Sequence, residues 1–275
     1  MGDHREINRH QRNDSKEFLN EYSKKVFKWK DGESFVDIGC GPGDVTKDFI
    51  WPKLPSNYSR YLCLDLSEDQ LDRCQRELMD KDRIFFAAID LGLKQDLTHL
   101  DQFDHAISLM CLHWIPNQVI ALENIFNLVA PGGDFFFSFV TECPNRKIIS
   151  ALMKSEKWKT YFPMKFRCCE PYWRSQDPTV IFTKFLREAG FTNIKIELRE
   201  ILYEWETPEQ FYKYVNEFAR RLLLKHIPEK HIEEFLWDQI DLATELNVIV
   251  SSRNRDKPID LYKIIVGFAE KPVKV

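Results

Sequence analysis

The sequence predicts an α/β fold, a doubly wound and mostly parallel sheet of seven strands with helices on both faces. From residue 35 onward, short apolar runs alternate with amphipathic segments, and right-handed strand–helix–strand crossovers turn this alternation into a parallel sheet. The runs are apolar throughout, which is typical of strands that are buried on both faces. A length of 275 residues suffices for one domain of this kind with elaborations.

The expected elements follow the chain in order. Short apolar runs predict strands at residues 34–39, 61–67, 83–90, 103–111, 134–140, 193–205 and 260–270. Amphipathic segments predict helices at residues 43–51, 68–78, 117–129, 177–190, 207–222 and 232–243. Residues 1–30 are expected to form an N-terminal helical segment, and residues 31–275 a single domain with added elements at about 145–175 and 203–255.

Known start and stop residues set the helix boundaries. Ser67 and Gln70 form a capping box before the second helix. Pro52 ends the first helix, and Gly190 ends the fourth. The Pro-Gly-Gly run at residues 131–133 is expected to close the third helix and to lead into the next strand.

Composition excludes several classes of protein. The formal charge is −4 and the pI is near 6.0, so the chain lacks the excess of basic residues that is typical of nucleic-acid-binding proteins, and no nucleic-acid partner is expected. The seven cysteines are scattered without a CxxC pair, and no histidine spacing suggests a ligand set. This pattern predicts reduced thiols and no metal site. No signal sequence or membrane-spanning run is present, which predicts a cytoplasmic protein without a membrane partner. The oligomeric state stays open, a homodimer included.

Residues 35–46, FVDIGCGPGDVT, place three glycines between the first strand and the first helix. Loops of this kind hold triphosphates, dinucleotides or S-adenosylmethionine. A triphosphate loop needs Lys and then Ser or Thr after its last glycine, and this chain has Asp44 and Val45 there. A dinucleotide is disfavoured because Asp37 and Asp44 flank the glycines, and negative charge there repels a pyrophosphate. The two carboxylates favour S-adenosylmethionine, which carries an ammonium and a sulfonium.

Acidic residues end three successive strands of the predicted sheet, and they are Asp37, Asp65 and Asp90. Parallel strands end at one edge of a sheet, where ligands bind. There Asp65 is placed to accept the ribose hydroxyls and Asp90 to meet the adenine amino group. This combination predicts S-adenosylmethionine as cofactor. The full expected set of cofactor-binding residues is Asp37, Gly39, Cys40, Gly41, Gly43, Asp65, Leu66, Asp90, Leu91 and Ser108.

Longer stretches carry a resemblance that extends across almost the whole chain. They include DIGCGPG at 37–43, LDLS at 64–67, LHWIPNQVIALENIFNLVAPGGD at 112–134 and IPEKHIEEFLWDQID at 227–241. With these stretches the chain resembles the class I S-adenosylmethionine-dependent methyltransferases, and more narrowly the insect juvenile hormone acid methyltransferases. The resemblance implies a Rossmann-like class I methyltransferase fold with a helical, aromatic-rich cap, and an N-terminal segment over the cofactor site.

The same resemblance implies a substrate and the residues that hold it. The substrate would be a small apolar carboxylic acid, farnesoic acid or a juvenile hormone acid, and the product its methyl ester. Gln11 and Trp114 would hold the carboxylate as catalytic residues. The expected substrate-binding set is Gln11, His113, Trp114 and Tyr172. For His113 a structural role facing away from the substrate is also open.

This chemistry fits the residues. Carboxylic acids have pKa values of about 4 to 5, so the nucleophile is already ionised at neutral pH and needs no general base. Neutral donors such as an amide and an indole N–H orient its oxygens and leave them nucleophilic. A bidentate Arg would bind the carboxylate more strongly and make it a weaker nucleophile. Aromatic residues are dense in the two added elements, which predicts an apolar pocket.

Three alternatives remain at this point. A methyltransferase acting on an amine or a hydroxyl of another small molecule would need a general base near the methyl carbon. A catalytically inactive methyltransferase fold would bind an apolar ligand without turnover. An NAD-dependent oxidoreductase would bind NAD at the glycine loop.

Overall fold

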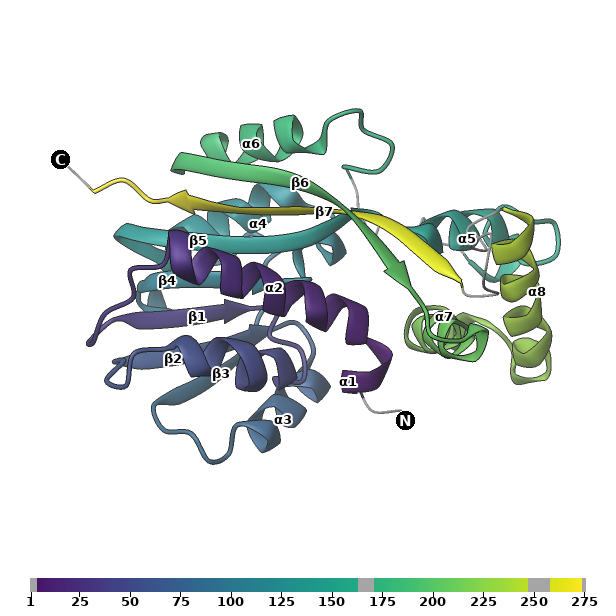
Figure 1. Cartoon of the computed structure of the whole chain (residues 1–275), viewed down its shortest axis with the longest axis horizontal. Coiled ribbons are helices and arrows are strands. Elements are labelled where there is room, and N and C mark those ends of the chain that lie inside the picture. The colour runs from purple at the N-terminus through teal and green to yellow at the C-terminus, as the bar shows by residue number, and fades with distance from the viewer. Residues whose placement is uncertain (1–3, 163–170, 247–257, 274–275) are drawn as a thin grey trace. The chain divides into compact units, whose positions relative to one another are not determined.

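The computed structural model describes residues 4–162, 171–246 and 258–273 (Figure 1). The elements expected at 145–175 and 203–255 therefore lie partly outside the described residues, at 163–170 and 247–255.

A seven-stranded sheet forms the frame of the fold, in the order β3-β2-β1-β4-β5-β7-β6 (Figure 1). Its strands are β1 (Ser34–Ile38), β2 (Arg60–Asp65), β3 (Ile84–Ala88), β4 (Phe103–Leu109), β5 (Val129–Glu142), β6 (Thr192–Glu204) and β7 (Ile259–Glu270). β1 pairs in parallel with β2 and β4, β2 with β3, and β4 with β5. The predicted α/β class is confirmed. The strand order changes direction between β1 and β4, the point at which such sheets bind ligands.

The helices are α1 (His4–Ile7), α2 (Arg9–Lys25), α3 (Glu68–Glu77), α4 (Gln118–Leu128), α5 (Pro144–Leu152), α6 (Pro178–Ala189), α7 (Pro208–Leu222) and α8 (Ile232–Glu245). Half of the predicted capping box of α3 is confirmed, because the Ser67 side chain accepts a hydrogen bond from the backbone N–H of Gln70. The reciprocal bond is missing, since the backbone N–H of Ser67 donates to Asp65 and the side-chain oxygen of Gln70 has no partner. Gly190 ends α6 with a φ of 107°, a left-handed conformation that favours glycine.

Two expected boundaries are wrong. The segment predicted as a helix at 43–51 is helical, with a π-helical turn at Thr46–Ile50 followed by a short 3-10 turn at Trp51–Lys53, so Pro52 lies within it and does not end it. The Pro-Gly-Gly run does not separate α4 from the next strand, because β5 already begins at Val129. Lys271 explains the second difference. Its ammonium donates to the carbonyls of Phe126 and Val129 at 2.7 Å each, which closes α4 without a glycine.

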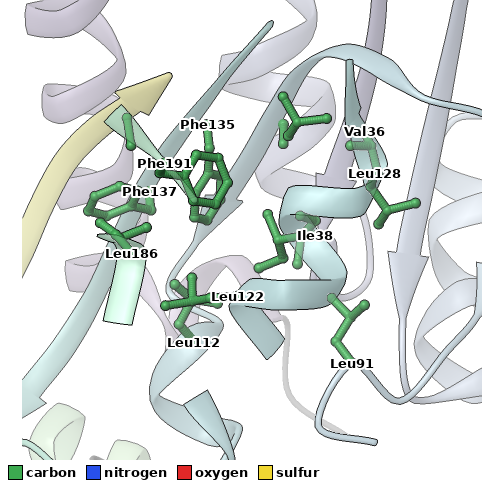
Figure 2. Packing of buried hydrophobic residues seen from close by; sticks show 14 of the residues in the cluster. Val36, Ile38, Leu91, Leu112, Leu122, Leu128, Phe135, Phe137, Leu186 and Phe191 are labelled. Carbon is green, nitrogen blue, oxygen red and sulfur yellow. The ribbon is translucent and has the colours of Figure 1, made fainter. Parts of the chain in front are cut away.

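The side chains of β5 show how the sheet is buried on both faces. Phe135 and Phe137 join a large hydrophobic cluster, where they lie beside Leu186 of α6 (Figure 2). Phe136 faces the other way, and its ring centroid lies 4.9 Å from that of Tyr22 on α2. The alternation follows from the two-residue repeat of a strand, so the continuous apolar run serves two layers of helices.

The chain divides into two compact units. One comprises residues 11–141, 169–199 and 264–275 and contains the glycine loop and most of the sheet; we call it the sheet unit. The other comprises residues 1–10, 142–168 and 200–263; we call it the helical unit. Its core is rich in aromatic side chains, among them Trp158, Phe211 and Phe235. In the described parts of the chain no helix combines the length and apolarity that crossing a bilayer requires.

Candidate functional site

The carboxyl ends of β1 and β2 hold the glycine loop in place. Ile38 pairs with Leu64 in the last register position of the two strands. The backbone N–H groups of Gly39 and Cys40 then both donate to the carbonyl of Leu64, at 2.7 and 3.1 Å. The loop therefore begins at a fixed point on the sheet edge where the strand order changes direction.

Each of the three glycines has a positive φ, of 70° at Gly39, 56° at Gly41 and 81° at Gly43. A Cβ at Gly39 would overlap the Sγ of Cys111, and one at Gly43 would lie 2.6 Å from the Sγ of Cys74. A Cβ at Gly41 would meet nothing within 4 Å. The outer two glycines thus allow the loop to pack on the protein, whereas the middle one faces open space where a ligand can approach the backbone.

Asp65 fixes the loop from the end of β2. One carboxylate oxygen accepts from the backbone N–H of Gly41 at 3.0 Å, and the other from that of Ser67 at 2.9 Å. A carboxylate offers about four acceptor positions, so two remain for ligand hydroxyls. Asp90 is similarly held just beyond β3, where its side chain accepts from the N–H of Gly92 at 2.8 Å.

The other two acidic residues are not open to a ligand in the way the sequence suggested. Asp37 is 3% exposed and accepts from the hydroxyls of Thr46 at 2.5 Å and Tyr61 at 3.2 Å. Burial raises its pKa to about 7. Asp44 forms a buried ion pair with Arg12 of α2, which also contacts Asp48 at 2.6 Å. The expectation that both carboxylates contribute negative charge beside the glycines is therefore wrong for Asp44, because Arg12 neutralises it.

The remaining expected cofactor residues differ in exposure. The Ser108 hydroxyl is fully buried and donates to the carbonyl of Ile38 at 3.1 Å. Leu91 belongs to the hydrophobic core, while Leu66 is 67% exposed. The Cys40 thiol lies 3.6 Å from the carbonyl oxygen of Gly41. Contacts of these residues with the cofactor stay predictions.

The segment after β4 carries the expected substrate residues His113 and Trp114. Met110 has a φ of 52°, a left-handed conformation that costs about 1 kcal/mol in a residue other than glycine. It leads into a 3-10 turn at Leu112–Trp114. Trp114 is 40% exposed. His113 is buried, and its Nδ1 accepts from the backbone N–H of Val140 at 3.4 Å. Burial lowers the pKa of His113 to about 3, so the ring is neutral at physiological pH.

Gln118, which the sequence did not single out, supports this turn. Its side-chain N–H donates to the carbonyls of Leu112 and Ile115 at 2.6 Å each. Its side-chain oxygen accepts from the Tyr172 hydroxyl at 3.0 Å. Tyr172 is 1% exposed and packs in the hydrophobic core. Tyr172 therefore lies behind the turn and contacts Gln118, and its contact with the substrate stays a prediction.

Gln11 lies on α2, next to Arg12, and is half-buried. Its backbone carbonyl accepts from the Ser15 hydroxyl at 2.8 Å. Among the residues that the structure describes, no hydrogen bond uses its side-chain amide. The amide is thus available to a ligand, and its role as a carboxylate donor stays a prediction. Arg12, which the sequence did not single out, has no spacing signal because its partners lie 32 and 36 residues away.

Comparisons with known proteins agree with this geometry. Residues 36–135 match the family model described as a methyltransferase domain. The chain is 30% identical over 268 residues to the juvenile hormone acid O-methyltransferase of Drosophila melanogaster, which covers 96% of this chain and 89% of the relative. It is 31% identical over 278 residues to the protein of the same name from Bombyx mori, with 98% and 96% covered.

Solved structures share the fold at low sequence identity. The YcgJ protein of Bacillus subtilis superposes with a TM-score of 0.59 at 12% identity, over 94% of this chain and 99% of that one. Phosphoethanolamine N-methyltransferase 2 of Haemonchus contortus, in complex with S-adenosyl-L-methionine, gives a TM-score of 0.52 at 17% identity, over 94% of this chain and 52% of that one. At these identities the likeness establishes the fold alone.

The parallel sheet, the glycine loop at its switch point and the acidic residues beyond β2 and β3 define a class I S-adenosylmethionine-dependent methyltransferase. Two relatives are 30% and 31% identical to the chain over nearly their whole length, so the chain belongs to the juvenile hormone acid O-methyltransferase family. The predicted family, enzyme class and cofactor are confirmed.

The residues present fit this cofactor. S-adenosylmethionine supplies an electrophilic methyl group on a sulfonium. The open side of Gly41 gives room for backbone contact, and Asp65 keeps acceptor capacity for the ribose hydroxyls.

Proposed function

We propose that this protein transfers the methyl group of S-adenosylmethionine to the carboxylate of a small apolar acid of the juvenile hormone acid or farnesoic acid type, which gives the methyl ester. The observation that carries the proposal is the 31% identity to a curated juvenile hormone acid O-methyltransferase over 98% of this chain and 96% of the relative. A cytoplasmic location and the absence of a nucleic-acid partner belong to the same proposal.

The chemistry of the turn after β4 supports a carboxylate as nucleophile. The acid is ionised at neutral pH because its pKa is about 4 to 5, so it attacks the methyl carbon without a general base. His113 is buried beside Trp114, with ring centroids 5.0 Å apart. With a pKa lowered to about 3 by burial, this imidazole is too weak a base to activate an amine or a hydroxyl.

Orientation and exclusion of water are then the main sources of rate enhancement. The carboxylate anion and the sulfonium cation lose their charges as the bond forms, and a site of low dielectric constant favours such a step. The Gln11 amide and the Trp114 indole N–H are the neutral donors that we propose for the carboxylate. Arg12, the cation next to Gln11, is held by Asp44 and Asp48, which leaves the acid free of a strong counter-ion.

A substrate panel tests this proposal. The purified protein is incubated with methyl-labelled S-adenosylmethionine and with a juvenile hormone acid, farnesoic acid, a saturated fatty acid of similar length, and farnesol. We expect label in the methyl esters of the terpenoid acids and none on the alcohol. Label on farnesol, or on no compound of the panel while the cofactor still binds, would show that the substrate class is wrong.

A further inference from the structure

Three cysteine side chains meet beneath the glycine loop, and no step proposed for methyl transfer requires their thiols. Cys40 comes from the loop, Cys63 from the middle of β2 and Cys74 from α3. Their three Sγ atoms all lie within 4.8 Å of one another. The residues are 7%, 0% and 0% exposed. Because the three cysteines come from separate elements, they have no CxxC spacing by which the sequence could have predicted the cluster.

The surroundings of this thiol cluster keep it dry and fixed. The backbone of Gly43 packs directly on Cys74, since a Cβ there would lie 2.6 Å from its Sγ. Cys63 is held within the sheet, paired in register with Asp37 on β1 and Phe86 on β3. In the described part of the chain, no other group of three or more Cys, His, Asp or Glu side chains brings its ligand atoms this close together.

The ligand set selects one class of ion. Three sulfurs without an oxygen or imidazole partner suit soft d10 ions, whereas Mg²⁺ and Ca²⁺ require oxygen ligands. A metal–sulfur bond of about 2.3 Å puts sulfur atoms about 3.8 to 4.0 Å apart in tetrahedral or trigonal geometry. The thiols therefore need to move by less than about 1 Å from their present separation.

We propose that Cys40, Cys63 and Cys74 form a three-sulfur binding site for a soft d10 metal ion such as Cu⁺ or Zn²⁺. The site adjoins the glycine loop, where Cys40 is also an expected cofactor contact, and its test does not depend on the proposed methyl transfer. On binding, three metal–sulfur bonds form and the protons of the bound thiols pass to the solvent.

Cadmium is the probe that tests the site, because its thiolate complexes absorb in the ultraviolet through sulfur-to-metal charge transfer. The reduced full-length protein is titrated with Cd²⁺, and bound metal is counted after dialysis. We expect Cys74→Ala and Cys63→Ala each to lose one bound ion per chain relative to wild type. Cys143→Ala, a matched control outside the cluster, is expected to lose none. Equal metal content in Cys74→Ala and Cys143→Ala would overturn the proposal.

A second measurement needs no variant and so does not depend on how a substituted chain folds. The cadmium NMR shift of the loaded wild-type protein reports how many sulfurs bind the ion. A shift typical of three sulfurs, with Cd²⁺ displaced by Zn²⁺ or Cu⁺ and retained in excess Mg²⁺, is the expected result. A shift typical of oxygen ligands or of a single sulfur would overturn the proposal, whether or not the protein methylates any acid.

Discussion

Trp114 and Arg12 differ in exposure and in the contacts that hold them, which are local in sequence around Trp114 and distant for Arg12. Trp114 is partly exposed at the end of a turn that Gln118 supports through two carbonyls. Arg12 is buried with its guanidinium on Asp44, directly after the last glycine. We therefore expect substitution of Trp114 to change turnover and substitution of Arg12 to change stability.

Trp114→Phe removes the indole N–H and keeps an aromatic ring. If that N–H donates to the carboxylate, its loss costs about 1 to 3 kcal/mol, which lowers turnover by roughly 5- to 150-fold. Cofactor affinity should be nearly unchanged in calorimetry. Trp237→Phe, at an exposed position on α8, serves as the control and should keep wild-type turnover. Full turnover in Trp114→Phe would rule out the proposed hydrogen bond from the Trp114 indole N–H to the substrate carboxylate.

Arg12→Ala leaves the Asp44 carboxylate buried without its counter-ion. Breaking a buried pair from one side costs about 3 to 5 kcal/mol of the free energy of unfolding. Urea unfolding measures the loss, and replacing both residues with leucine is expected to restore most of it. Arg9→Ala is the control, because its pair with Glu206 is about half exposed on both sides and should be worth less than about 1 kcal/mol. Equal losses in the two alanine variants would contradict the buried pair.

At the scale of elements, β4 carries a cluster of charged side chains around His105, near the start of the strand and away from the Leu112–Trp114 turn that follows it. His105 of β4 contacts Asp134 of β5 through Nδ1 at 3.0 Å and Glu33 through Nε2 at 2.9 Å. Both ring nitrogens face carboxylate oxygens, so both must carry protons to donate. Burial alone would lower the pKa of His105, but the two carboxylates outweigh it and the pKa is raised above 6.5.

This cluster predicts how stability depends on pH. A histidine whose pKa is higher in the folded than in the unfolded state stabilises the fold fully below 6.5, and this contribution is lost as pH rises through the folded-state pKa. The free energy of unfolding should therefore fall above pH 6.5. In His105→Gln the decrease in the free energy of unfolding above this pH should be smaller than in wild type. A wild-type free energy of unfolding that rises over the same range would contradict the raised pKa of His105.

At the scale of the whole molecule, local patterns predicted the strands and the helix caps because neighbouring residues determine them. The pairing of Arg12 with Asp44 and the meeting of Cys40, Cys63 and Cys74 depend on how distant segments pack, so spacing could not reveal them. The early start of β5 has the same origin, since Lys271 near the C-terminus closes α4. The acidic strand ends led to the right cofactor, although one of the two flanking carboxylates proved to be neutralised.

Cofactor binding should stabilise the whole chain. A ligand that binds only the folded state adds about 2.7 kcal/mol at a concentration of 100 times its Kd. For a chain of this length each kcal/mol raises Tm by roughly 2 to 4 °C, so S-adenosylmethionine should raise Tm by several degrees in a thermal scan. NAD at the same concentration should leave Tm unchanged. A shift with NAD in place of S-adenosylmethionine would contradict the assignment of the loop.

The position of the transferred methyl group tests the central claim most directly. The protein is incubated with a juvenile hormone acid and S-adenosylmethionine labelled with carbon-13 in its methyl group, and the product is read by NMR. The account predicts one labelled carbon with the chemical shift of a methyl ester, formed at a rate that varies little above about pH 6 because the acid is already ionised. Label on any other atom of the product, or a rate that keeps rising with pH as a general base ionises, would contradict it.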